Sequence, residues 1–158
     1  EGDRRRMAEA GAVAAFCPTS NLFLGSGLFD YGEATSQGVH VGLATDVGGG
    51  TSFSMIQTVA EAYKVSALKG LALAPERLLY LATLAGARAL DLDDRIGSFR
   101  EGNEADFLVL DPEATPLLAR RMSYTESLSE KLFALLTLGD DRCVASTWIN
   151  GERAWKRG

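Results

Sequence analysis

The chain has 158 residues, of which 46% are apolar and 23% charged, and its formal net charge is −5 at pH 7. These values are typical of a globular domain with a core, and the negative charge argues against a nucleic-acid partner, which would need a basic surface. No apolar stretch approaches the roughly 20 residues that span a bilayer, and the N-terminus lacks a signal-peptide apolar region. Two cysteines, Cys17 and Cys143, are too few for a disulfide framework, so we expect buried free thiols in a cytoplasmic protein.

The first ninety residues alternate between short apolar strands and amphipathic helices. The pattern predicts, in chain order, a helix over 1–10, a strand over 12–16, a loop-like stretch over 17–38, a strand over 39–44, a helix capped at Thr51 or Ser52 that ends at Gly70, and a helix from Pro75 to about Leu90. The buried stripe of the longest helix is predicted at Phe53, Ile56, Val59, Ala60 and Tyr63. Continuously apolar strands that alternate with helices indicate a parallel sheet.

After residue 90 the pattern changes to shorter, strand-rich segments. It predicts a brief strand over 96–99, a strand over 105–110, a helix over 129–138 and strands over 143–149 and 152–156. The Asn150-Gly151 pair between the last two strands is a strong hairpin signal. The sequence therefore predicts an α/β unit over 1–90, followed by a β-rich unit over 91–158.

Asp46 is the strongest candidate for chemistry because it follows an apolar strand and precedes Gly48, Gly49 and Gly50. In parallel α/β folds, functional side chains gather at the carboxyl ends of the strands. The carboxylate could ligate a metal, accept a proton or cap the following loop, and the glycine amides could instead cradle an anion. The stretch lacks the Gly-Lys-Ser/Thr of a P-loop, so a phosphate site would rest on the glycines alone.

His40, the one histidine of the chain, lies six residues before Asp46, which is roughly 20 Å along an extended strand. Metal ligands converge within about 2 Å of one ion, so we expect His40 to have a structural or surface role and not to share a metal with Asp46. Ser20 and Thr51 have no local base and no Gly-x-Ser-x-Gly motif. We expect both to make loop hydrogen bonds and not to act as nucleophiles.

Two stretches have distinctive sequences: 16–27 is Phe-Cys-Pro-Thr-Ser-Asn-Leu-Phe-Leu-Gly-Ser-Gly, and 42–50 is Gly-Leu-Ala-Thr-Asp-Val-Gly-Gly-Gly. Both resemble the guanine deaminases of the amidohydrolase superfamily. Three further stretches, 81–90, 96–111 and 150–152, are similar to the superfamily's last barrel helix, its return into a small β-sandwich and the final hairpin of that sandwich. The resemblance implies an α/β fold with the last two strands and helices of a TIM-like (β/α)8 barrel in 1–90 and strands of the β-sandwich in 91–158. A complete barrel takes about 250 residues, so this chain could hold only part of one.

The same resemblance implies a reaction and a role for Asp46. Zinc-bound hydroxide would hydrolyse guanine to xanthine and ammonia, and Asp46, which matches the family's aspartate after the eighth barrel strand, would ligate the zinc and take the proton of the bound water. The family's His-x-His pair, two further histidines and catalytic glutamate have no counterpart in this chain. A catalytic zinc needs about three protein ligands, so we expect the chain alone to hold no catalytic zinc and to be inactive. We also expect it to self-associate or to pair with the missing N-terminal part.

Two other functions stay open at this point. The chain could belong to another amidohydrolase, chlorohydrolase-like or a different aminohydrolase, since the substrate contacts lie outside it. It could also be a non-catalytic α/β module that binds an anion at 48–50 or serves as an assembly surface. Phosphate binding that is lost in Gly49→Val but kept in Asp46→Ala would favour this module.

Overall fold

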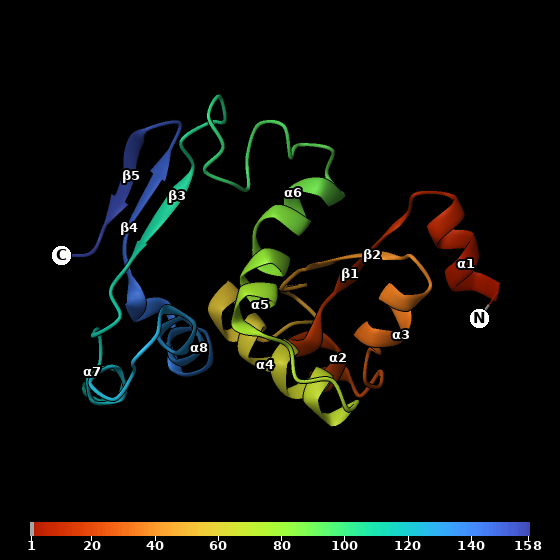
Figure 1. Cartoon of the computed structure of the whole chain (residues 1–158), viewed down its shortest axis with the longest axis horizontal. Coiled ribbons are helices and arrows are strands. Elements are labelled where there is room, and N and C mark those ends of the chain that lie inside the picture. The colour runs from red at the N-terminus through yellow and green to blue at the C-terminus, as the bar shows by residue number, and fades with distance from the viewer. Residues whose placement is uncertain (1) are drawn as a thin grey trace.

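The structure, a computed structural model that describes residues 2–158, has a mixed α/β fold, as predicted. A two-stranded parallel sheet and a three-stranded antiparallel sheet lie on opposite sides of the molecule, with helices between them (Figure 1). The strands are β1 (Val13–Phe16), β2 (His40–Leu43), β3 (Phe107–Leu110), β4 (Val144–Ile149) and β5 (Glu152–Lys156). The helices are α1 (Gly2–Glu9), α2 (Pro18–Leu24), α3 (Tyr31–Ser36), α4 (Met55–Leu68), α5 (Pro75–Ala82), α6 (Leu84–Ala89), α7 (Pro116–Met122), α8 (Leu128–Leu138) and the 3-10 helix η1 (Asp141–Cys143). None of the described helices is long and apolar enough to span a membrane.

The parallel sheet pairs β1 with β2 in a register that runs from Val13 opposite His40 to Phe16 opposite Leu43. Helices α5 and α6 contact β2, and α4 packs against α2 and α5. Side chains of the strands and of these helices form one buried core: Phe16, Val41, Leu43, Val59, Val65, Leu78 and Leu81. The two strands are therefore held by burial of their apolar residues against helices, as the unbroken apolar runs in the sequence indicate.

The region predicted as a loop over 17–38 contains two short helices, so this prediction was wrong. Pro18 occupies the first turn of α2, where its fixed φ suits a helix, and Gly25 ends that helix at φ +67° in the left-handed conformation. Asp30 caps α3, because its side chain accepts a hydrogen bond of 2.9 Å from the backbone N–H of Glu33. Pro18, which was expected only to end the preceding strand, thus also begins a helix.

Two predicted helices in 51–90 have different limits in the structure. Helix α4 begins only at Met55 with Ser54 as its cap, so Phe53 precedes the helix and is 84% exposed instead of buried. The helix predicted from Pro75 to about Leu90 is interrupted at Thr83, whose φ of −130° and ψ of −95° are not helical. The interruption separates α5 from α6, and both helices contact β2.

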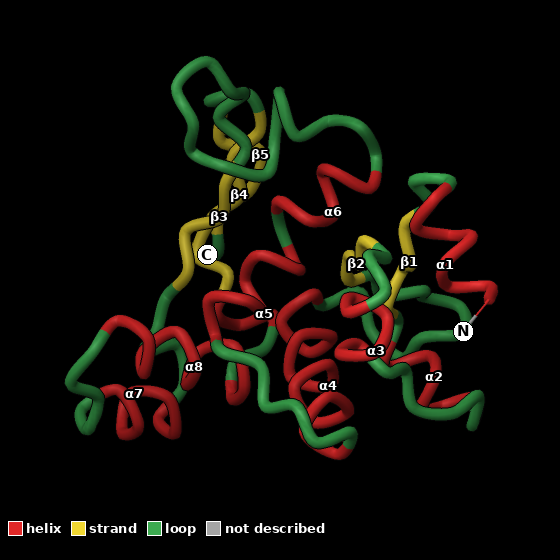
Figure 2. Tube along the Cα trace, turned by 45° about the vertical axis from the view of Figure 1, so that its right-hand side comes forward, coloured by secondary structure: helices red, strands yellow, loops and turns green. Residues whose placement is uncertain are grey.

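The antiparallel sheet has the order β3-β4-β5, and its last two strands form the predicted hairpin around Asn150 and Gly151, both at positive φ. Phe107 of β3 stacks on Trp148 of β4 with ring centroids 5.5 Å apart. The predicted strand over 96–99 is absent: this stretch lies in the long connection from α6 to β3 (Figure 2), where the backbone N–H of Ile96 bonds the carbonyl of Leu92 in a turn. The sequence reading also missed α7, which begins at a proline after the capping residue Thr115.

The last part of the chain returns to pack on the first. Helix α8 contacts α4 and α5, and Phe133 of α8 meets Tyr63 of α4 edge to face with ring centroids 4.9 Å apart. A second buried cluster joins α4, α7, α8 and η1: Ile56, Leu118, Met122, Ala134, Leu135 and Cys143. The two halves of the chain thus share buried apolar contacts.

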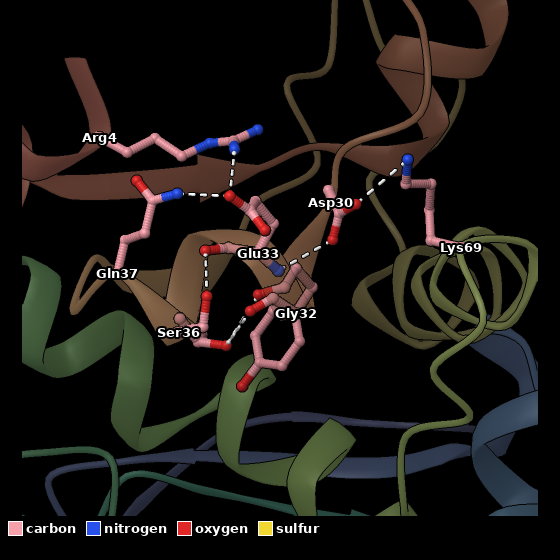
Figure 3. A network of polar contacts seen from close by, with 9 residues as sticks. Arg4, Asp30, Gly32, Glu33, Ser36, Gln37 and Lys69 are labelled. Atoms are coloured by element: carbon pink, nitrogen blue, oxygen red, sulfur yellow. Dashed lines mark hydrogen bonds and ion pairs between the residues drawn. The ribbon is translucent and has the colours of Figure 1, made fainter. Parts of the chain in front are cut away.

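Ion pairs fasten the N-terminal helices to one another (Figure 3). Arg4 of α1 lies 3.4 Å from the carboxylate of Glu33 in α3, which also accepts a hydrogen bond from Gln37. Lys69, which follows α4, lies 3.1 Å from the carboxylate of the capping residue Asp30. Because Asp30 binds both a helix N–H and a lysine, its pKa is held below its usual value, first by the N–H of Glu33 and then by Lys69.

Candidate functional site

The carboxyl ends of β1 and β2 lie at the same end of the parallel sheet, and the segments that follow the two strands lie side by side. The backbone N–H of Ala44 donates to the carbonyl of Phe16 at 3.1 Å, which extends the pairing one residue beyond β2. Asp46 follows two residues later, at φ +48° and exposed. Aspartate tolerates this left-handed conformation better than most residues do. Asp46 thus lies just beyond the carboxyl end of β2, as the sequence predicts.

The glycines after Asp46 form a tight turn around its own backbone. The carbonyl of Asp46 accepts hydrogen bonds from the N–H groups of Gly49, at 3.0 Å, and Gly50. A β-carbon on Gly50 would lie 2.0 Å from the carbonyl oxygen of Thr45, so only glycine fits there. Since both amides are bonded within the turn, and α4 begins five residues later, this loop does not present them to an anion.

Two hydroxyls from the first turn of α2 hold the end of the second strand. Ser20 Oγ donates to Asp46 Oδ2 at 2.7 Å, and Thr19 Oγ1 donates to the carbonyl of Thr45 at 3.3 Å. Both donors are buried, with exposed fractions of 3% for Ser20 and 6% for Thr19. A loop hydrogen bond was expected for Ser20, and it is present. The sequence did not predict that its partner would be Asp46, 26 residues away. The signal was available: both residues follow strands of one parallel sheet, so their segments must emerge at the same edge.

Cys17 also lies near Asp46, and the charge of Asp46 affects the pKa of its thiol. Burial raises the pKa of its thiol, and the negative charge of Asp46 raises it further. The expectation of a buried thiol holds for Cys143, which is fully buried, whereas Cys17 is only partly covered. A raised thiol pKa leaves Cys17 protonated at neutral pH and a poor nucleophile.

The other sequence candidates lie elsewhere or lack partners. His40 is exposed at the opposite end of β2, where it pairs with Val13 at the start of β1, and so it does not reach Asp46. Thr51 is exposed beyond the glycine turn. Within residues 2–158, no three His, Cys, Asp or Glu side chains converge as a metal site would require. The described residues therefore do not by themselves supply a complete set of metal ligands.

The chain is similar to known proteins over nearly its whole length. Residues 3–154 match the model of the amidohydrolase family. The chain is 51% identical over 152 residues to the guanine deaminase of Escherichia coli K12, an alignment that covers 96% of this chain and 35% of the relative. A solved structure of E. coli guanine deaminase superposes with a TM-score of 0.97 at 49% identity, covering 100% of this chain and 37% of that one. The structure of guanine deaminase from Bradyrhizobium japonicum gives a TM-score of 0.92 at 38% identity, covering 99% and 40% of the two chains.

The chain spans only about a third of the length of these relatives. The family match nevertheless covers nearly all of it, and the similarity extends over both of its sheets. The chain belongs to the amidohydrolase family, and over nearly its whole length it is similar to about a third of the guanine deaminases that it matches.

Proposed function

We propose that this chain is the C-terminal part of a guanine deaminase in which Asp46 ligates zinc and accepts a proton during the hydrolysis of guanine to xanthine and ammonia. The observation that carries the proposal is the exposed Asp46 carboxylate, held at the carboxyl edge of a parallel sheet by a buried hydroxyl. It is supported by the similarity of nearly the whole chain to guanine deaminases.

For the fold, we propose that residues 1–90 form the last two strands and helices of a TIM-like barrel and that 91–158 carry strands of a small β-sandwich. The parallel pair β1 and β2, with helices after each strand, supports the first assignment. The separate antiparallel sheet β3-β4-β5 supports the second.

In the proposed site, the carboxylate of Asp46 both ligates zinc and accepts a proton. One oxygen, Oδ2, accepts the Ser20 hydroxyl, and no other hydrogen bond to this carboxylate is found among residues 2–158, so Oδ1 is available to a metal or a proton. Zinc, when bound, acts as a Lewis acid that lowers the pKa of a coordinated water towards 7. Asp46 supplies one of the three protein ligands that such a site needs, so the others must come from outside this chain.

The sheet edges support the proposal that this chain pairs with the rest of the enzyme or with a second copy of itself. In the described residues, β1 and β2 pair only with each other, which leaves one backbone edge of each strand free. Apolar side chains are exposed near the carboxyl ends of these strands, among them Leu22, Phe23 and Val47. Free edges and exposed apolar side chains favour association, so light scattering of the isolated chain should show species larger than a monomer. A dilute, stable monomer would contradict this part of the proposal.

The activity is tested by complementation. The chain is co-expressed with the part of E. coli guanine deaminase that lies outside the matched region, and ammonia release from guanine is measured with and without zinc. We expect zinc-dependent release from the complex and none from either part alone.

Two variants make the test specific to the site. Asp46→Ala should abolish the activity of the complex, whereas His40→Ala, which changes an exposed residue at the opposite end of β2, should leave it intact. Full activity in Asp46→Ala, or zinc-dependent activity of the 158-residue chain alone, would overturn the proposal.

A further inference from the structure

Ser20 makes the one side-chain hydrogen bond that the described chain offers to the Asp46 carboxylate. Its 2.7 Å distance is that of a well-formed hydroxyl hydrogen bond. Only 3% of Ser20 is exposed, so water competes little for the bond. A buried donor at this distance restrains the position of Oδ2.

The backbone around Ser20 is itself firmly held. Pro18 starts α2, the N–H of Asn21 bonds the carbonyl of Cys17 at 2.9 Å, and Thr19 ties the same helical turn to the carbonyl of Thr45. The position of the Ser20 hydroxyl is therefore set by a helix turn that is anchored to the strand end carrying Asp46.

Gly49 closes the other side of the pair. A β-carbon built on it would lie 3.0 Å from Ser20 Oγ and 3.1 Å from Asp46 Oδ2, both tighter than ordinary van der Waals contact. The glycine backbone thus covers the hydrogen bond, and no larger residue fits without disturbing it. Oδ1, the other oxygen, accepts no hydrogen bond from the described residues.

We infer that Ser20 is a positioning residue, which holds Oδ2 of Asp46 so that Oδ1 is presented to the metal. The inference rests on the proposed function, because it assigns to Ser20 a role in orienting the ligand proposed there. Ser20 does not itself act as a nucleophile or touch the reacting atoms: the one histidine of the chain, His40, lies at the other end of β2 and cannot serve as its base. A hydrogen-bond donor that orients a metal ligand typically changes metal affinity or activity 10- to 100-fold when it is removed.

The experiment measures zinc affinity in the complemented complex by competition with a chromogenic chelator, for the unchanged chain and for Ser20→Ala. We expect Ser20→Ala to weaken zinc binding by about 10-fold or more and, at saturating zinc, to lower kcat while the KM for guanine changes little. Ser20→Thr keeps the hydroxyl and should recover most of the zinc affinity. Ser66→Ala is the matched control, because Ser66 is also buried, at 1% exposed, but its hydroxyl has no hydrogen-bond partner among the described residues.

Asp46→Ala separates failure of this inference from failure of the proposed function. If Asp46→Ala weakens zinc binding and Ser20→Ala does not, the role of Ser20 is overturned while that of Asp46 stands. If Asp46→Ala leaves zinc binding unchanged, both are overturned.

A crystal structure of Ser20→Ala, in the isolated chain or in the complex, gives a readout that does not depend on activity. We expect its Asp46 carboxylate to leave the orientation seen here, and an unchanged orientation would count against the inference. Thermal melting of each variant establishes that it is folded before these measurements are made.

Discussion

The backbone of Gly49 lies so close to Asp46 that a β-carbon on the glycine would stand 3.1 Å from the carboxylate oxygen Oδ2. Gly49 does not have a positive φ, so space alone and not backbone strain demands glycine at this position. The turn, the hydroxyl of Ser20 and the carboxylate are thus packed as one unit.

Gly49→Ala should therefore disturb the Ser20–Asp46 hydrogen bond and lower the free energy of unfolding by about 1–3 kcal/mol, the usual cost of overpacking. Chemical denaturation of the isolated chain measures the change. Gly86→Ala is the control: a β-carbon there meets nothing within 4 Å, and alanine favours the α6 helix. Equal effects of the two substitutions would mean that Gly49 is not tightly packed.

The thiol of Cys17 provides a probe of the Asp46 charge. Burial and then the Asp46 carboxylate raise its pKa, so the reactive thiolate is scarce at pH 8. In Asp46→Asn the second cause is removed, the pKa falls and alkylation of Cys17 should be faster at the same pH. Peptide mapping after iodoacetamide treatment distinguishes Cys17 from the fully buried Cys143. An unchanged rate would show that the carboxylate does not influence the thiol.

The buried side chain of Leu78 in α5 should be among the most costly to truncate. It is 0% exposed within the core shared by the parallel sheet and its helices. Leu78→Ala should reduce the free energy of unfolding by about 3 kcal/mol, within the range of 2–5 kcal/mol for such substitutions. Leu128→Ala removes the same atoms from a residue that is 82% exposed, and should change stability by less than about 0.5 kcal/mol.

Asp30 should contribute to the loss of stability in acid. Its pKa is lowered in the folded chain by the N–H of Glu33 and by Lys69, so its ionised form stabilises the fold above the pKa of an unfolded aspartate, about 3.9. That contribution is lost as the pH falls through the lower pKa of the folded state. In Asp30→Asn the decrease in stability from pH 5 to pH 2 should be smaller than in the unchanged chain, as measured by circular dichroism during denaturant titrations. Identical pH profiles would exclude a contribution from Asp30.

The sequence predicted those elements whose signal is local and repeated. The apolar runs that became β1 and β2 and the Asn150-Gly151 hairpin are confirmed within one or two residues. Short helices such as α2 and α3 were missed because six or seven residues give too little periodicity, and because proline, serine and aspartate occur both in loops and at helix starts.

The candidate site was predictable in part for the same reason. Asp46 was identified because a strand followed by a carboxylate and glycines is a local pattern. Its partner Ser20 was not, since their hydrogen bond depends on which strands are neighbours, and a single sequence encodes that only through the whole fold.

The edge-to-face contact of Tyr63 with Phe133 has a consequence for how the chain responds to being cut. The long connection between α6 and β3 is the obvious place for a protease to act, yet α8 beyond it is seated on α4 before it. A chain nicked in that connection would stay together through side chains after the peptide link was gone, and would run as one species in a native separation and as two in detergent.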